Sequence, residues 1–146
     1  MEGSKPDRLL ADGQISLAGR DGSSEKKSPM SSSSSPVQAR VCHASPKGYV
    51  DALAGIQRKT LLDGGRTQLV EFKLAMGAVI PAHQHPQEQT GYLLSGHMIL
   101  TIAGLAHQVN AGDSWTIPGG VEHGAQVLKD SVAIEVFSPL RQDYRN

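Results

Sequence analysis

Between residues 56 and 137, short runs of β-forming residues alternate with turn-forming residues, and this alternation limits the possible folds more than any other feature. The runs are IQRKTLL, TQLVEFKLAM, TGYLLS, HMILTIA, LAHQVN, SWTIP, AQVL and SVAIEVF, with Gly, Pro, Asn or Asp between them. No window of the chain shows a sustained helical period. Several short strands at close spacing favour a sandwich or barrel over alternating β and α units. The sequence therefore predicts an all-β domain.

The run at residues 67–76 shows the two-residue period of a half-buried strand. Its apolar side would carry Val70, Phe72, Leu74 and Met76, whereas Glu71 and Lys73 would face the other way. The runs on either side of Gly96 are predicted to form a tight hairpin at that glycine. The last two runs are predicted to be joined by a turn at Lys129–Asp130.

The composition changes near residue 40. The first forty residues contain no Phe, Trp or Tyr, and ten of them are serine. Such a segment buries too little apolar surface to offset the entropy lost on ordering it. We therefore predict a disordered segment at residues 1–40 and one folded domain at residues 41–146. A domain of this size buries roughly two thirds of the surface of its unfolded chain.

Charge and hydropathy exclude several classes of partner. The 14 basic and 14 acidic residues of the chain balance, so no electrostatic footprint for nucleic acid or an anionic membrane is expected. No apolar run is long enough to cross a bilayer, and the charged N-terminus lacks the apolar core of a secretory signal. Cys42 is the only cysteine, so the chain forms no internal disulfide. A cytoplasmic location is the simplest expectation.

Three of the six histidines have a spacing that suggests a metal site. On a strand, residues two apart point to the same side, so His83 and His85 would converge. Gln89 continues this parity and Glu88 does not. His123 follows the turn sequence PGGVEH, which could bring it to the same place. An isolated histidine is more commonly a surface or core residue, and His43, His97 and His107 are interpreted in that way.

The wider spacing resembles the two motifs of the cupin family. The first runs from Gly77 through the histidine pair and Gln89 to Gly96, and the second from Gly112 through Pro118-x-Gly120 to His123. This resemblance implies a double-stranded β-helix, or jelly-roll, barrel. It also implies a metal site inside the barrel near its mouth, with four ligands: His83, His85, Gln89 and His123.

Gln89 stands where cupins commonly have glutamate. With glutamine, all four implied ligands are neutral, so a divalent ion keeps its full charge and polarises bound oxygen atoms more strongly. Higher oxidation states of iron would lose a stabilising anion. The substitution therefore favours non-oxidative chemistry. Imidazole and amide ligands suit Zn, Ni, Mn, Fe or Co, and the ligand types do not choose among these metals.

The last run, in AIEVFSPLRQDY, holds three further candidates. Glu135 and Phe137 share a parity, and a carboxyl group inside an apolar barrel beside a cation is a candidate general acid or base. The alternative places Glu135 in solvent and lets Phe137 close the end of the barrel. Arg141 by itself would be interpreted as a surface arginine.

The tail and the segment HPQEQTGYLLSG together resemble the KdgF-type small single-domain cupins, which open the rings of 4,5-unsaturated uronates. The likeness covers nearly all of residues 52–144. It implies metal ligands at the four positions named above, a catalytic acid at Glu135, a pocket aromatic at Phe137 and a substrate-binding arginine at Arg141. One position differs, because these cupins have aspartate where this chain has Glu135. The extra methylene moves the carboxylate by about 1 Å, which can cost about a hundredfold in rate.

Three classes of function remain open. The first is a metal-dependent ring-opening isomerase or hydratase that acts on a small carboxylated sugar. The second is a metal- and ligand-binding barrel without catalysis, and the third is an iron or manganese dioxygenase. The chain resembles small single-domain cupins that form dimers, and this resemblance implies a homodimer. Catalysis is favoured if Glu135 and Arg141 both project into the cavity beside the metal.

Overall fold

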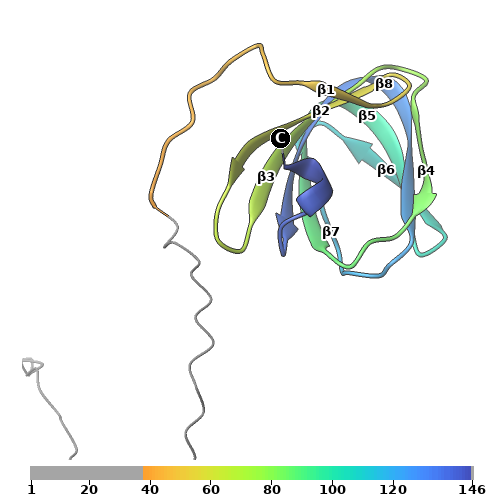
Figure 1. Cartoon of the computed structure of the whole chain (residues 1–146). Coiled ribbons are helices and arrows are strands. Elements are labelled where there is room, and N and C mark those ends of the chain that lie inside the picture. Colours follow the sequence, from red (N-terminus) through yellow and green to blue (C-terminus); the bar gives the residue numbers. More distant parts are fainter. Residues whose placement is uncertain (1–37, 146) are drawn as a thin grey trace, which may run out of the picture. The chain divides into compact units, whose positions relative to one another are not determined.

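The computed structural model describes residues 38–145. Residues 1–37, which make up nearly all of the segment predicted to be disordered, lie outside this range. The chain forms one antiparallel sheet of eight strands that curls into a barrel (Figure 1). The strands are β1 (Val50–Leu53), β2 (Ile56–Asp63), β3 (Gln68–Leu74), β4 (Val79–His83), β5 (Glu88–Ile102), β6 (Leu105–Asn110), β7 (Ser114–Ile117) and β8 (His123–Ser138). The predicted all-β class is confirmed.

Two long strands give the barrel its two layers. The strands follow the order β1-β2-β3-β8-β5-β6, while β4 pairs with β8 and β7 pairs with β5. The first half of β5 lies between β7 and the second half of β8, and the second half of β5 lies between β6 and the first half of β8. Each long strand therefore contributes to both layers, which closes the sheet around a single interior.

The predicted alternation in β3 is confirmed where the strand is paired. Val70, Phe72 and Leu74 are buried, and Glu71 and Lys73 lie on the other face. Met76 is 70% exposed because β3 ends at Leu74 and the chain turns away from the interior. The other buried apolar residues come from β2, the β3–β4 loop, β5, β6, β7 and β8: Ile56, Ala78, Leu93, Met98, Leu100, Val109, Trp115, Ile117, Ala125, Val127, Ala133 and Phe137.

Two predicted turns are wrong. Gly96 lies inside the continuous strand β5, and the chain passes through Lys129 and Asp130 within the continuous strand β8. The register between these strands shifts on both sides of Gly96, which adopts a φ of 99°. A Cβ atom there would lie 2.0 Å from the Ser131 hydroxyl oxygen. Glycine therefore serves a bulge that bends the strand across the barrel, instead of a hairpin.

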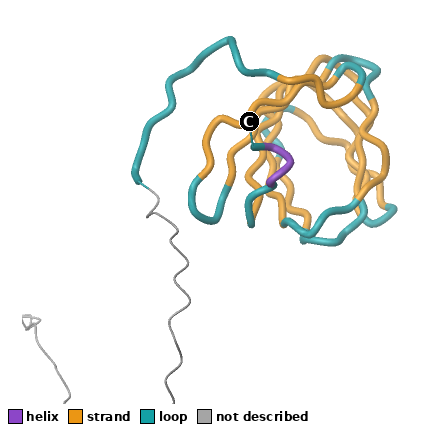
Figure 2. The backbone as a smooth tube through the Cα atoms, viewed as in Figure 1, coloured by secondary structure: helices purple, strands orange, loops and turns teal. Residues whose placement is uncertain are grey.

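A short 3₁₀ helix, η1 (Gln142–Tyr144), follows β8 and packs beside β2 and β3 (Figure 2). The Thr60 hydroxyl donates to the Tyr144 carbonyl at 2.7 Å, and the Tyr144 ring meets Phe72 edge-on. These contacts join the tail to residues 84 and 72 positions earlier in the sequence. Residues 139–145 are therefore an ordered part of the barrel's rim.

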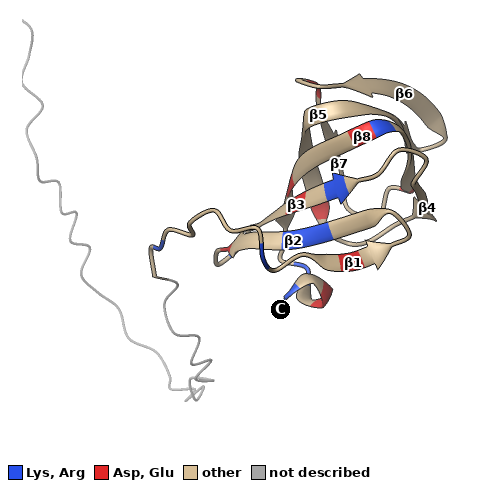
Figure 3. Cartoon of the chain, turned by 90° about the horizontal axis from the view of Figure 1, so that it is seen from above, with Lys and Arg blue, Asp and Glu red and all other residues tan. Residues whose placement is uncertain are grey.

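Acidic and basic residues are interspersed on the strands that carry charge, and β3 and β8 each carry both signs (Figure 3). This distribution agrees with the balanced charge of the sequence. Within residues 38–145, no helix is both long enough and apolar enough to span a membrane.

Candidate metal centre and pocket

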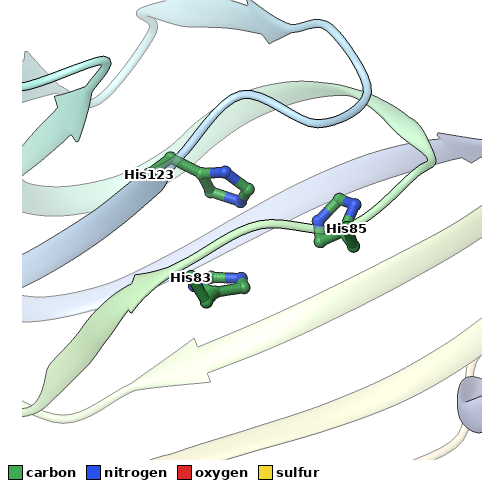
Figure 4. A group of neighbouring side chains, drawn as sticks. All are labelled: His83, His85 and His123. Atoms are coloured by element: carbon green, nitrogen blue, oxygen red, sulfur yellow. The ribbon is translucent and has the colours of Figure 1, made fainter.

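Three histidines converge at one side of the barrel interior (Figure 4). His83 is the last residue of β4 and pairs with His123, the first residue of β8. His85 lies two residues beyond β4, outside any strand. The ring centroids are 4.3 Å apart for His83 and His123, and 5.0 Å apart for His85 and His123. One ring nitrogen from each histidine lies within 4.8 Å of the others, so all three can bind one ion.

Backbone carbonyls fix the orientation of all three rings. Nδ1 of each histidine lies 2.8 to 3.0 Å from a carbonyl oxygen two residues away, on Pro81, Gln87 and Val121 respectively. A carbonyl only accepts, so each Nδ1 carries the proton and each Nε2 keeps its lone pair for a metal. Nε2 of His123 is buried and has no hydrogen-bond partner among the described residues. This arrangement fits a bound cation.

Gln89, the fourth ligand implied by the sequence, lies beside the three histidines. It is 4% exposed, and its Oε1 lies 2.9 Å from Nε2 of His85. Because Nδ1 of His85 holds that ring's proton, two lone pairs face each other across this distance. Two neighbouring ligand atoms, each about 2.1 Å from one ion, would be separated by about 3 Å. The amide nitrogen of Gln89 donates to Glu135 at 3.1 Å, which keeps the amide oxygen turned toward the histidines.

Burial favours the neutral form of the His85 and His123 imidazoles. Burial and, to a smaller extent, the charge of Arg141 lower the pKa of His85. Burial also lowers the pKa of His123, with smaller effects from the other two histidines and Arg141. Neutral imidazole is the form that binds metal. His83 is the most exposed of the three and lines the pocket.

His83 and His123 form part of one wall of a cavity of about 490 Å³. This volume falls within the range of small-molecule sites. Residues predicted from the sequence that line it are His83, Gln89, His123, Glu135, Phe137 and Arg141. His85 lies beside this wall and meets the Phe137 ring edge-on at 5.8 Å. The cavity therefore brings the predicted metal ligands and the predicted catalytic residues together.

Glu135 lies on the cavity side of β8, so the alternative that it points to solvent is not what the structure shows. Removal of its carboxyl group from water raises the pKa of Glu135 to about 7, against opposing effects of Trp115 and Arg141. A carboxyl group with this pKa exists in both protonation states near neutral pH. It can therefore give and take a proton.

Trp115 is a pocket residue that the sequence reasoning missed. Gly91 pairs with Trp115 of β7 on one side and with Glu135 of β8 on the other, so the three share a cross-strand row. The indole lies over the glycine, and a Cβ at Gly91 would come within 2.1 to 2.4 Å of it. The indole nitrogen is buried without a hydrogen bond of normal geometry but lies near enough to Glu135 to lower its pKa. Only the pairing register could have revealed this neighbour.

We expect Gly91→Ala to destabilise the barrel and disturb Glu135. The added methyl overlaps the Trp115 ring, which is 9% exposed and has little room to move. Overpacking of this kind costs about 1–3 kcal/mol. Thermal denaturation measures the loss, and Gly64→Ala is a suitable control because its φ is not positive and a Cβ there would meet only ordinary contacts, at 3.5 Å or more. Equal melting temperatures for Gly91→Ala and the wild type would contradict the close packing.

Arg141 is held at the rim of the cavity by η1. Its guanidinium carbon lies 3.9 Å from the centre of the Tyr144 ring and 5.4 Å from that of Phe137. Nη2 and Nε donate to the two carboxylate oxygens of Asp143, at 2.8 and 3.3 Å. Only 14% of the Arg141 side chain is exposed. Its position differs from that of a free surface arginine.

The comparisons with known proteins agree with this architecture. A family model for the cupin domain matches residues 70–138. KdgF from Halomonas sp. is 34% identical, with a TM-score of 0.65, over 68% of this chain and 92% of that one. An RmlC-like cupin from Shewanella frigidimarina is 26% identical, with a TM-score of 0.70, over 75% of this chain and 98% of that one.

A more distant structure shares the fold alone. It is a predicted oxalate decarboxylase from Thermotoga maritima, 19% identical with a TM-score of 0.59, over 69% of this chain and 100% of that one. A comparison with curated protein sequences gives no match. The identity with KdgF over nearly all of that protein, together with the cupin-domain match, settles the family: this chain is a member of the cupin superfamily, close to the KdgF type.

Proposed function

We propose that this cupin is a metal-dependent enzyme that opens the ring of a small unsaturated sugar acid without oxidation. The observation that carries the proposal is the placement of Glu135 and Arg141 in the cavity that His83, His123 and Gln89 line, with His85 beside them. The likeness to KdgF, at 34% identity, supports the same reading. A divalent ion bound by these four neutral side chains would supply positive charge that stabilises negative charge on substrate oxygens.

The substrate's carboxylate would pair with Arg141. Two of the five guanidinium donors are used by Asp143, which leaves three for a ligand. A planar guanidinium matches a carboxylate with two parallel hydrogen bonds and so fixes the orientation of the sugar. Phe137 and Tyr144 border the guanidinium and exclude water from its faces. The guanidinium of Arg141 is therefore partly desolvated, and its charge attracts an anion more strongly than it would in water.

Glu135 would move the proton. In its acid form it protonates C4 of the 4,5-double bond, and a water molecule adds to C5 and returns a proton to the carboxylate. The resulting hemiketal collapses by breaking the C5–ring oxygen bond, which leaves a ketone at C5. The hydrated aldehyde released at C1 loses water, so the overall reaction is an isomerisation. Gln89 holds one carboxyl oxygen of Glu135 at 3.1 Å and so limits the positions from which the proton is delivered.

The proposal is tested with purified, metal-loaded protein and a 4,5-unsaturated galacturonate. We expect the ultraviolet absorbance of the conjugated double bond to disappear faster than in the spontaneous reaction. Heat-denatured protein with the same metal is the control. An unchanged rate with correctly folded, metal-loaded protein would contradict the ring-opening function.

A second candidate, a barrel that binds metal and ligand without catalysis, is favoured by one observation. Glu135 stands where the KdgF-type cupins have aspartate, and its longer side chain is held by Gln89. If the cavity binds the unsaturated sugar but leaves its absorbance unchanged, this candidate replaces the first. Oxygen uptake during the same assay would instead support a dioxygenase, which the neutral ligand set makes the least favoured of the three.

A further inference from the structure

Tyr144 lies between two arginine side chains. The guanidinium carbon of Arg58 is 4.1 Å from the centre of the Tyr144 ring, and that of Arg141 is 3.9 Å from it. Two groups this close to one ring centre cannot share a face, so they occupy opposite faces. The ring edge also meets Phe137, at 5.6 Å between centroids. Arg58, on β2, thereby supports the ring against which Arg141 rests.

Arg58 also holds the backbone of η1. Its Nη2 donates to the carbonyl oxygen of Asp143 at 3.1 Å. The carboxylate of this same Asp143 binds the guanidinium of Arg141 in a two-pronged contact. Arg58 is therefore linked to Arg141 by two routes, one through the Tyr144 ring and one through Asp143. Each route ends at a different side of the Arg141 guanidinium.

This arrangement has an energetic cost. Nη1 of Arg58 is buried and has no hydrogen-bond partner within residues 38–145. Arg58 forms no ion pair in this part of the chain, and the like charge of Arg141 lies at most about 8 Å away, across the ring. Arg58 as a whole is partly exposed, but a buried donor without a partner is destabilising. Such departures from good packing concentrate at functional sites.

We propose that Arg58 is a positioning residue that holds the guanidinium of Arg141 ready for the substrate's carboxylate. Fixing this side chain in advance removes the entropy that a free arginine would lose on binding. The proposal rests on the role given to Arg141 under the proposed function. Arg58 also lines the cavity, but its proposed role is exerted through Tyr144 and Asp143.

The positioning can be measured without substrate. In ¹⁵N-labelled protein, the Nε–H signal of Arg141, identified by its loss in Arg141→Lys, should be displaced by the Tyr144 ring and exchange slowly with water. In Arg58→Met this signal should move to the position of a free arginine. Arg66→Met, which removes an arginine from the exposed β2–β3 turn, should leave it unchanged. Arg58→Lys keeps the charge but loses the planar stack, so it should restore the signal only in part.

Binding of D-galacturonate supplies the functional readout, because Trp115 is the only tryptophan and lines the cavity. Loss of a preorganised charged contact should weaken binding by about tenfold or more in Arg58→Met, with unchanged metal affinity. An unmoved Arg141 signal in both Arg58 variants overturns the proposal, as does unchanged galacturonate affinity in Arg58→Met. If the signal moves but the wild type binds no galacturonate, the positioning stands and the role of Arg141 in the proposed function fails.

Discussion

Alanine at both His83 and His85 is expected to lower the affinity for a divalent metal at least about a thousandfold. Loss of a hydrogen-bond partner to a metal ligand already costs about 10- to 100-fold, and this variant removes two of the four ligands themselves. The remaining pair, His123 and Gln89, offers only two donor atoms, fewer than the three protein ligands of a typical zinc site. Calorimetric titration of the metal-free protein with Zn²⁺ measures the effect.

The matched control replaces His97 and His107 by alanine. These histidines lie outside the cluster, so the variant loses the same number of imidazoles without touching the cavity. It should bind Zn²⁺ with the affinity of the wild type. Metal should also stabilise the wild type by about 2.7 kcal/mol at a hundredfold excess over the dissociation constant, and this gain should vanish in the His83/His85 variant alone. Equal metal affinity in the two double variants would contradict the proposed site.

Glu135→Gln should reduce kcat for ring opening by roughly 10²- to 10⁴-fold, the contribution typical of a positioned acid or base. Glutamine keeps the length of the side chain and an oxygen that can accept from the amide of Gln89. It has no proton to deliver to carbon. The dissociation constants for metal and for galacturonate should therefore change little, while turnover falls.

The control for this variant is Glu122→Gln, an exposed acid next to His123 in the sequence, which should leave kcat unchanged. Glu135→Asp tests the departure from the KdgF type. If the cavity has adjusted to glutamate, the shorter side chain loses its contact with Gln89 and kcat falls. A Glu135→Gln variant with wild-type kcat would exclude Glu135 as the acid.

The site was predictable because its residues are encoded in short motifs. The spacing of His83, His85 and Gln89 anticipates which side chains meet, and Gln89, but not Glu88, is buried. His85 joins His83 in the cluster, as the strand parity predicts, although His85 lies outside the strand. The hydrogen bond between its Nδ1 and the Gln87 carbonyl turns the ring toward the cluster instead. The motif therefore carried more information than strand geometry.

The surroundings of the site were not predictable in the same way. Arg58 and Trp115 lie in ordinary β-forming runs, and their neighbours Tyr144 and Glu135 are far away in the sequence. Cross-strand register, which is set by tertiary packing, brings these pairs together. The hairpin predicted at Gly96 was wrong for a related reason. A positive-φ glycine between two apolar runs looks the same in a hairpin and in a bulge until the partner strand is known.

X-ray absorption of the Zn²⁺-loaded protein, combined with elemental analysis, tests the metal site most directly. The structure leads us to expect one ion per chain, bound by three imidazole nitrogens and at least one oxygen, at about 2.0–2.2 Å. Signals from the imidazoles should be lost in the His83/His85 double variant. Substoichiometric metal, or a spectrum with fewer than two imidazoles, would contradict the site and remove the basis for the proposed chemistry.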